Sequence, residues 1–526
     1  MTNSIPDLEE ADCILITGSN TTETHPLIAS RVFKAKERGA KLIVIEPRRI
    51  QLADYADLYL RQRPGTDVAW INGMMNIIIS QGWQDDDFIK NRTEGFEAVR
   101  EKVKEYPPEK VEQITGIPRD DLFRAAEIYA KSERSAILYA MGITQHTSGT
   151  DNALSLCNLA MLTGNIGKRG SGVNPLRGQN NVQGACDMGG LPNVFTAYQA
   201  VTDENARKKF EEAWGVKLPA QVGLTLMEMM NGAAEGKLKA MFILGENPLL
   251  SDPDIAHVKE ALENLEFLAV QDIFLTETAQ LADIVLAGAS WAEKDGTFTG
   301  TDRRVQRIRK AIEPIGESKP DWQTICQLAK ETGGKGFDYQ SPEEVFAEIT
   351  RLTPSYQGIS YSRLDKEGIQ WPCRSNDDPG TEFLHRDKFT KGLGTFTPVD
   401  FREPAELPDE QYPLTLTTGR GMFQYHTGTL TRNSPTLESE LSEGFIEINP
   451  LDAERLNIAN DETVKVASRR GEIRIKAQIT PKVDKGVVFI PFHFAESAAN
   501  VLTNSALDPV AKIPELKVCA VKVEKI

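Results

Sequence analysis

The sequence predicts an α/β protein with two Rossmann-like layers of parallel sheet, related by pseudo-symmetry, and a C-terminal β-barrel. Two observations predict this fold. A pattern of strand, glycine turn, helix and strand occurs twice, and the last part of the chain changes to short strands of alternating polarity. With 526 residues, 40% of them hydrophobic, the chain is long enough for several domains. We expect a first α/β domain at 1–178, a second with a polar loop at 179–330, an irregular connection at 331–408 and the barrel at 409–526.

The first copy of the pattern spans residues 11–57. An apolar run at 13–16 ends at Gly18, and a second run at 42–45 ends at Glu46. Short, continuous apolar runs are typical of parallel strands that are buried on both faces. A glycine at the end of the first strand lets a ligand approach the backbone, and the following helix directs unpaired N–H groups at an anion.

The second copy has the same parts in the same order. Residues 241–244 end at Gly245-Glu246-Asn247, and residues 267–270 end at Gln271-Asp272. Pro26 and Pro253 follow the two glycines at equal spacing, and we expect both in the first turn of a helix. Neither copy is G-x-G-x-x-G, which disfavours an ordinary NAD fold. The repeat predicts two nucleotide-type half-sites; plain turn residues are the alternative.

Polar groups follow other strands and turns of the α/β layers. Asp67, after the turn at 63–66, suits either a purine edge or a helix cap. A strand at 136–139 leads to Gly142 and His146, and the carboxyl ends of such strands are where ligands bind in open α/β sheets. The loop at 177–190 holds one arginine among carboxamides, which suits a small planar anion; a solvated hinge is the alternative.

The barrel is predicted from strands at 414–418 and 487–492 and from a hairpin between 464 and 479. A net charge of −16 argues against a nucleic-acid surface. No apolar stretch approaches the ~20 residues of a membrane helix. The six cysteines include no C-x-x-C, so this chain carries no iron–sulfur or zinc signature. Scattered reduced thiols fit a cytoplasmic enzyme, although an export signal could have been lost with an N-terminal segment.

Together these motifs resemble the molybdopterin oxidoreductases of the dimethyl-sulfoxide-reductase superfamily. Within that superfamily, residues 142–146 and 177–189 are very similar to formate dehydrogenase alpha subunits. The resemblance implies bis-molybdopterin guanine dinucleotide with molybdenum or tungsten, and oxidation of formate to CO2. It implies that Arg177 holds formate and that Gln179 and His146 shape the pocket; an exposed turn histidine is the alternative for His146. The implied cofactor contacts are Gly18, Asn20, His25, Glu46, Arg48, Gly65, Asp67, Gly142, Gly245, Glu246, Asn247, Gln271, Asp272, Thr276, Arg303, Gly419, Arg420, His426, Thr427, Phe492, Asn500 and Lys517.

One departure from the family pattern stands out. Members begin with a cysteine-ligated [4Fe–4S] domain and a cysteine or selenocysteine that binds the metal, and this chain matches neither; Cys13 lies inside the first strand. No metal ligand is therefore assigned here. We expect a selenocysteine codon upstream that was read as a stop. We also expect that the isolated chain is inactive and exposes apolar surface on its second layer.

The resemblance implies iron–sulfur or flavin electron-transfer subunits as partners, with no nucleic acid and no membrane insertion of this chain. Two alternatives within the superfamily stay open. One is another reductase, such as an assimilatory nitrate reductase, because nitrate is also a small planar anion. The other is a scaffold subunit of a respiratory complex that lacks molybdenum.

Overall fold

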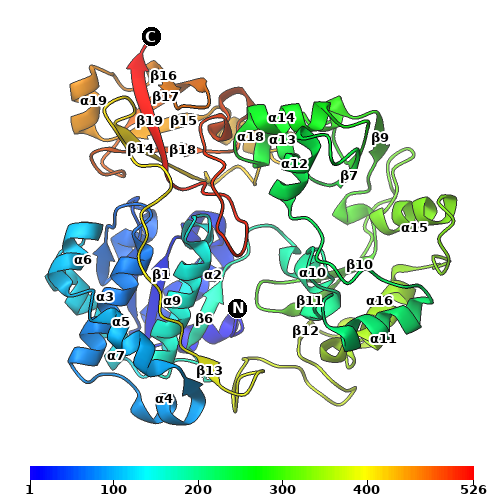
Figure 1. Ribbon diagram of the computed structural model, residues 1–526, viewed down its shortest axis with the longest axis horizontal. Helices are drawn as coiled ribbons and strands as arrows, with labels where there is room; N and C mark the ends of the chain where they lie inside the picture. The colour runs from blue at the N-terminus through cyan, green and yellow to red at the C-terminus, as the bar shows by residue number, and fades with distance from the viewer. The chain divides into compact units, whose positions relative to one another are not determined.

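A computed structural model describes all residues, 1–526 (Figure 1). The chain divides into two compact units. The first comprises Met1–Gly178, Leu250–Ala256 and Phe383–Ile526, and the second comprises Gln179–Leu249 and His257–Glu382. None of its helices combines the length and the apolar character that crossing a bilayer requires.

The α/β part of the first unit is built on a five-stranded parallel sheet with the order β3-β2-β1-β5-β6. The chain leaves β1 toward β2 on one side and later returns to β5 on the other, so the strand order reverses between β1 and β5. Such a switch point opens a crevice at the carboxyl ends of the strands. The strands are β1 Cys13–Thr17, β2 Lys41–Ile45, β3 Leu58–Leu60, β5 Ser135–Tyr139 and β6 Gly172–Pro175.

Both faces of this sheet are buried, as its continuous apolar runs predicted. Along β1, Cys13 and Leu15 belong to one hydrophobic core, and Ile14 and Ile16 belong to another. The period of two along a strand produces this alternation. The covering helices are η1 Pro6–Glu10, α1 Thr21–Thr24, α2 Pro26–Glu37, η2 Gln51–Tyr55, α3 Asp67–Ser80, α4 Asp86–Arg92, α5 Phe96–Val103, α6 Pro108–Thr115, α7 Arg119–Lys131, α8 Met141–Thr144 and α9 Gly149–Leu162.

The C-terminal part of the first unit is a closed barrel with the order β14-β18-β15-β17-β16-β19, which confirms the predicted barrel. The predicted hairpin is β16 and β17, paired from Thr463 with Lys476 to Ala467 with Glu472. The strands are β14 Leu414–Gly419, β15 Phe445–Ile448, β16 Thr463–Ala467, β17 Glu472–Ile479, β18 Val487–Pro491 and β19 Cys519–Lys525. The short helices are α18 Pro435–Glu440, α19 Pro450–Leu456, η7 Ala495–Ser497 and η8 Ala499–Val501.

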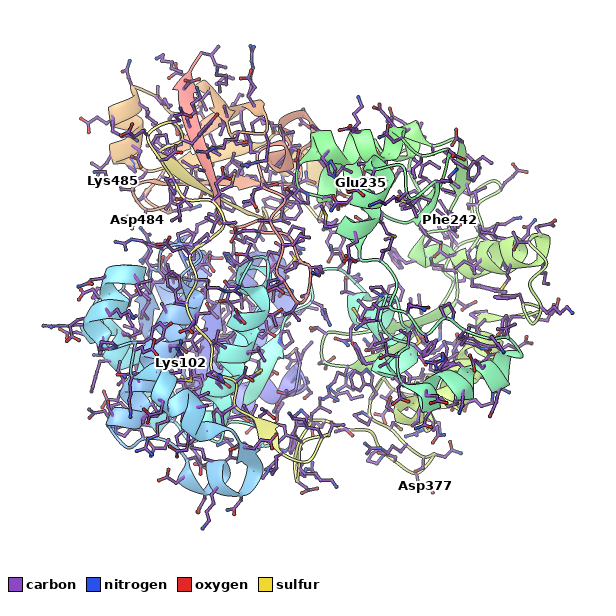
Figure 2. The ribbon with its side chains drawn as sticks, in the orientation of Figure 1. Lys102, Glu235, Phe242, Asp377, Asp484 and Lys485 are labelled. Atoms are coloured by element: carbon purple, nitrogen blue, oxygen red, sulfur yellow. The ribbon has the colours of Figure 1, made fainter.

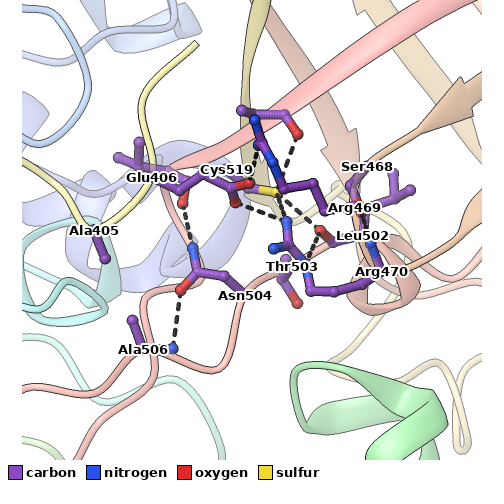
Figure 3. Close-up of polar contacts among 12 residues, drawn as sticks. Ala405, Glu406, Ser468, Arg469, Arg470, Leu502, Thr503, Asn504, Ala506 and Cys519 are labelled. Carbon is purple, nitrogen blue, oxygen red and sulfur yellow. Dashed lines mark hydrogen bonds and ion pairs between the residues drawn. The ribbon is translucent and has the colours of Figure 1, made fainter. Parts of the chain in front are cut away.

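The segment before the barrel is tied at both of its ends. Near its start, β13 Gly394–Thr395 pairs with β4 Thr93–Glu94. Near the barrel, the Glu406 carboxylate accepts hydrogen bonds from Arg469 at 2.6 Å and Arg470 at 2.7 Å, and Arg470 also donates to Cys519 Sγ at 3.0 Å (Figure 3). Burial raises the pKa of the Cys519 thiol to about 12, so this sulfur is a packing group and not a nucleophile.

In the second unit, β7 Ala240–Leu244, β8 Phe267–Asp272 and β9 Ile284–Ala287 form a three-stranded parallel sheet. The repeat seen in the sequence is structural. Asp57 Oδ2 accepts a hydrogen bond from the Leu42 amide at 2.9 Å, and Asp283 Oδ2 accepts one from the Leu268 amide at 2.7 Å. Each aspartate thus closes its copy by binding the second amide of the middle strand.

The turns of the two copies also agree, with one exception. Gly18 and Gly245 both have left-handed backbone, at φ +58° and +63°. Pro26 opens α2 as predicted. The prediction for Pro253 was wrong, because α13 spans Pro248–Ser251 and α14 spans Ile255–Glu263, so Pro253 lies between two helices.

The rest of the second unit is more regular than expected. Residues 342–370 contain the regular elements α16 Pro342–Leu352, η6 Pro354–Tyr356, α17 Tyr361–Leu364 and β12 Ile369–Gln370. The irregular connection predicted from 331 therefore does not describe them. Glycine and proline around these short elements hid the periodicity of α16, whose Phe346 and Leu352 are buried. The remaining elements are α10 Val182–Asp187, η3 Thr196–Tyr198, α11 Glu204–Trp214, α12 Leu226–Ala234, η4 Ala279–Leu281, η5 Trp291–Glu293, β10 Gly296–Thr299, β11 Arg304–Ile308 and α15 Asp321–Glu331.

The sheet of the second unit leaves much of its apolar surface exposed. Phe242 of β7, labelled in Figure 2, is 37% exposed, Phe267 of β8 is 42% exposed, and all four residues of β9 are exposed. Parallel sheets are normally covered on both faces. This agrees with the expected apolar surface on the second layer.

Candidate cofactor site

The carboxyl ends of β1 and β5 touch at two glycines of the first unit. The Gly142 amide donates to the Gly18 carbonyl at 3.0 Å. A Cβ on Gly18 would lie 2.6 Å from the Ile143 nitrogen, and one on Gly142 would lie 2.5 Å from the Gly18 Cα. Only glycine at both positions allows this contact, which forms the floor of a cleft at the switch point of the sheet.

The cleft encloses about 910 Å³ of empty space, including its open mouth. Strand ends and turns of the sheet form one wall, and the ends of barrel strands β14 and β18 form the other. Its lining comprises Gly18, Ser19, Asn20, Thr24, His25, Glu46, Pro47, Arg48, Ile50, Gln62, Pro64, Gly65, Asp67, Ala140, Met141, Gly142, His146, Leu176, Gly178, Thr417, Thr418, Gly419, Arg420, Phe489, Phe492 and Lys517.

Many residues predicted from the sequence meet in this one cleft, although they are far apart in the chain. They come from the ends of three sheet strands, from the turn before α3 and from the barrel. The predicted site residues in the lining are Gly18, Asn20, His25, Glu46, Arg48, Gly65, Asp67, Gly142, His146, Gly419, Arg420, Phe492 and Lys517.

Several buried polar atoms of the lining lack a hydrogen-bond partner within the protein. Glu46 Oε2 and Gln62 Oε1 are free acceptors, and Asn20 Nδ2 and two nitrogens of Arg420, Nε and Nη2, are free donors. Buried polar groups are otherwise almost always paired, so these atoms indicate a polar ligand. The acceptors suit the N–H edge of a purine, and Arg420 suits a phosphate.

The barrel side of the cleft carries uncompensated positive charge. No acidic side chain forms an ion pair with Arg420, and burial lowers its pKa. Burial and the neighbouring Arg420 lower the pKa of Lys517 to about 7. Outside the lining, burial lowers the pKa values of His426 and His493 to about 4, so these rings add no charge near neutral pH. Because buried charge is costly without a partner, an anion bound here would be stabilised.

The sheet side of the cleft is acidic. Burial and the nearby Asp67 carboxylate raise the pKa of Glu46 to about 7. Asp67 accepts a hydrogen bond from the Trp70 indole at 3.1 Å, and burial raises its pKa as well. The cleft is therefore polarised, with carboxylates at the sheet and cations at the barrel.

Two predicted residues have partners that define their roles. Arg48 donates to both oxygens of Glu447, at 2.6 and 2.7 Å, and lies 4.1 Å over the Phe489 ring, so its guanidinium ties β2 to the barrel. His146 is only 2% exposed, which excludes the alternative of an exposed turn histidine. Its Nε2 lies 2.9 Å from the Gly142 carbonyl oxygen, within the cofactor cleft.

The predicted substrate residues lie at the start of the polar loop. The Arg177 carbonyl is 2.7 Å from Nε2 of His25, the residue that precedes α2. Gln179 begins the second unit, and its carbonyl accepts a hydrogen bond from the Val182 amide at 3.4 Å.

Other predicted residues lie outside the lining of this cleft. Asn500 donates to the carbonyls of Leu250 and Ser251 at 3.0 and 2.9 Å, and Thr427 Oγ1 lies 3.0 Å from Thr429 Oγ1. His426 has a left-handed backbone, and its carbonyl contacts the His493 ring. Asn500 therefore joins a barrel loop to the Leu250–Ser251 segment, and the contacts of His426 and Thr427 lie within the barrel loops.

The residues predicted for the second half-site lie at the strand ends of β7 and β8 in the second unit. Asn247 is fixed there, because its Oδ1 accepts from the Thr278 hydroxyl at 2.7 Å and its Nδ2 donates to Glu277 at 2.8 Å. Gln271 Oε1 is buried without a partner. The remaining predicted residues at these ends are Gly245, Glu246, Asp272 and Thr276.

Arg303 does not belong to those strand ends. It lies in the turn between β10 and β11, is 2% exposed and donates to the carbonyls of Thr381 and Glu382 at 3.0 and 3.2 Å. These contacts join the turn to the backbone at 381–382, and the predicted cofactor contact of Arg303 stays a prediction.

Some lining residues were not predicted. Gln62 could have been found from its position before the Arg63-Pro64-Gly65 turn, but nothing local signals the unpaired atom that matters. Thr417 and Phe489 reach the cleft only because β14 and β18 are neighbours in the barrel. The sequence therefore predicted the lining residues that lie in turns, but not all of those that line the cleft from the barrel strands.

A cleft with unpaired polar groups at the switch point of a parallel sheet is typical of proteins that bind a nucleotide cofactor. A family model described as molybdopterin oxidoreductase matches residues 1–331, and one described as molydopterin dinucleotide binding domain matches residues 414–520. This chain belongs to the molybdopterin oxidoreductase family, which confirms the resemblance inferred from its motifs.

Relatives resemble the chain along its whole length. It is 58% identical to "F420-dependent formate dehydrogenase subunit alpha" of Methanocaldococcus jannaschii, with 100% of this chain and 78% of the relative covered. It is 42% identical to "Formate dehydrogenase H" of Escherichia coli, with 100% and 74% covered. Among solved structures, acetylene hydratase from Pelobacter acetylenicus has a TM-score of 0.76 at 21% identity, covering 99% of this chain and 81% of that one, which shows the shared fold.

Proposed function

We propose that this chain is the catalytic molybdopterin subunit of a formate dehydrogenase, which converts formate into CO2, a proton and two electrons. The observation that carries the proposal is the 58% identity to a formate dehydrogenase alpha subunit over 100% of the chain. Relatives in Methanococcus maripaludis with the same description are 54% and 52% identical. The nitrate reductase and scaffold alternatives have no comparable support.

The residues of the cleft fit one guanine dinucleotide of a bis-molybdopterin cofactor with molybdenum or tungsten. Glu46 and Gln62 would accept hydrogen bonds from the base, and Arg420 with Lys517 would face the pyrophosphate. Gly245 to Asn247 and Gln271 would receive the second dinucleotide. When bound, the cofactor supplies the two-electron redox chemistry.

Arg177 is proposed to hold the formate carboxylate. A guanidinium binds a planar carboxylate through two parallel hydrogen bonds, which also orients the C–H bond of formate. The contact between His25 and the Arg177 carbonyl supports this role, because it fixes the backbone next to the guanidinium. Gln179 would lie beside the anion, and buried His146, which lines the cleft, would help to shape the pocket.

The finer parts of the proposal concern electron transfer. A [4Fe–4S] cluster with a cysteine or selenocysteine metal ligand, iron–sulfur or flavin partner subunits and a cytoplasmic location are inferred from the resemblance. The names of the archaeal relatives add F420 as a candidate acceptor. Reading the DNA upstream of the Met1 codon tests the cluster and the ligand.

The function is tested by anaerobic expression of the gene together with its flanking DNA and neighbouring genes. We expect formate-dependent reduction of viologen or F420 and no reduction of nitrate. Arg177→Lys should lower kcat/KM for formate about 100-fold, because lysine cannot bind the anion bidentately. Arg61→Lys, at a half-exposed arginine of the first unit, is the control. Nitrate reduction, or a metal-loaded enzyme that ignores formate, would exclude the proposal.

A further inference from the structure

Asp187, at the end of α10, is a fully buried carboxylate with four hydrogen-bond donors. Its Oδ1 accepts from Gln183 Nε2 at 2.8 Å and from the Tyr198 hydroxyl at 2.9 Å. Its Oδ2 accepts from the Tyr356 hydroxyl and from the Trp371 indole, each at 2.7 Å. Asp187 is 0% exposed, and its bonds to Gln183 and Tyr356 are buried, whereas those to Tyr198 and Trp371 are partly buried.

The donors come from separate parts of the second unit. Gln183 lies on α10 itself, Tyr198 in η3, Tyr356 in η6, and Trp371 directly after β12. Tyr356 belongs to the hydrophobic core that also contains Val305 and Ile369, and Trp371 packs against that core. Asp187 therefore attaches the short helix α10 to a rigid core.

The backbone near one donor is strained. Ala197 and Tyr198 have φ values of 52° and 61°, a left-handed conformation that ordinary residues avoid. Such a residue persists only where the surrounding structure over-determines its conformation. The bond from the Tyr198 hydroxyl to Asp187 is one contact that holds this turn.

The other end of α10 is fixed as well. Asn181, the residue before the helix, has a left-handed φ of 63°, and its Oδ1 accepts from the Thr299 amide at 2.9 Å. A Cβ on Gly184 would lie 2.0 Å from that Oδ1, so glycine is required for the contact. Both ends of α10 are thus fixed, and Gln179 lies just before its N-terminal end.

We propose that Asp187 is a positioning residue for substrate binding: through α10 it fixes the backbone at Gln179, two residues after Arg177. This inference rests on the proposed function, because only there do Arg177 and Gln179 receive a substrate. If Asp187 had only a structural role, it would stabilise the fold and leave the affinity for formate unchanged. A positioning role means that Asp187 also determines the affinity for formate.

The burial of Asp187 explains why a neutral replacement should disturb the loop. In Asp187→Asn the new amide could accept only on its oxygen, so its NH2 group would face two donors. Losing charge-assisted, buried hydrogen bonds is strongly unfavourable when the donors remain in place without acceptors. Because the donors belong to a rigid core, α10 is the part that should move.

The first test is hydrogen exchange of the 526-residue chain. In Asp187→Asn we expect the amides of residues 179–187 to exchange at least about tenfold faster, with the β7–β8 sheet unchanged. Tyr356→Phe, which removes one donor and keeps the carboxylate, should show a smaller change in the same peptide. Tyr339→Phe is the matched control, because its hydroxyl also binds a carboxylate, Glu348, at 2.7 Å in the same unit.

The second test uses the assembled, cofactor-loaded enzyme. Asp187→Asn should raise KM for formate about tenfold or more while kcat changes by less than about threefold. Tyr356→Phe should raise KM in the same direction, and it carries the test if Asp187→Asn does not fold. Unchanged exchange at 179–187, or an unchanged KM in both variants, would overturn the proposal. If the wild-type enzyme oxidises no formate, the proposed function fails, and hydrogen exchange alone then decides whether Asp187 holds α10.

Discussion

The ion pair between Arg48 and Glu447 makes a quantitative prediction about how the sheet and barrel of the first unit hold together. The two side chains share two short hydrogen bonds, and Arg48 and Glu447 are 8% and 1% exposed. Arg48→Met leaves the buried Glu447 carboxylate without both of its short hydrogen bonds, and only the exposed Lys482 ammonium, 3.9 Å away, remains near it. Breaking a buried pair in this way costs about 3–5 kcal/mol. Loss of the guanidinium from the Phe489 ring adds to this cost.

The neighbouring arginine is the matched control. Arg49 also pairs with a carboxylate, Asp54, at 2.7 Å, but both side chains are largely exposed. Exposed pairs contribute about 0–1 kcal/mol, so Arg49→Met should have little effect on stability. The two substitutions remove the same chemical group at adjacent positions, and they differ mainly in burial.

The assay is hydrogen exchange of β15 and β18 as a function of guanidinium concentration, which reports the unfolding free energy of the first unit. Arg48→Met should lower it by several kcal/mol, and Arg49→Met by less than about 1 kcal/mol. Adding Glu447→Gln to Arg48→Met should restore part of the loss, because it removes the unpaired charge. Equal effects of the two arginine substitutions would refute the reasoning.

Two further predictions concern charge and surface. The folded-state pKa of Lys517, about 7, is below the ordinary 10.5, so the unfolded chain binds more protons between these values and stability rises with pH across that window. Lys517→Met should remove up to about 1.4 kcal/mol per pH unit of that rise in urea titrations between about pH 7 and 9, and an unchanged slope would contradict the burial argument. Phe242→Glu should lower dye binding and self-association, because it places a charge on the open sheet of the second unit. Leu27→Glu, at a leucine that is 81% exposed, should change neither dye fluorescence nor self-association measured by light scattering. If Leu27→Glu and Phe242→Glu lowered self-association equally, the association would belong to another surface.

The local signals in the sequence determined much of this protein. Continuous apolar runs specified the strands of both layers, since a parallel strand buried on both faces has no polar face to show. Glycines with left-handed backbone marked the turns at Gly18 and Gly245. Alternation of apolar and polar residues specified the barrel hairpin, and the positions of Gly18, Glu46 and Gly142 after apolar runs predicted that they meet at one edge of the sheet.

Only the tertiary structure decided how those signals are used. Nothing in the sequence indicates that Arg48 pairs with Glu447, because partners so distant in the chain are joined only when β2 packs against the barrel. The contacts of Asn500 and Arg303 are with backbone carbonyls that no side-chain pattern reveals. In the sequence, Asp187 is one polar residue of the loop at 177–190. Only the fold brings three distant donors to it and shows a buried carboxylate that accepts hydrogen bonds on both oxygens. Periodicity records what one element requires, whereas a side chain's partner depends on which elements become neighbours.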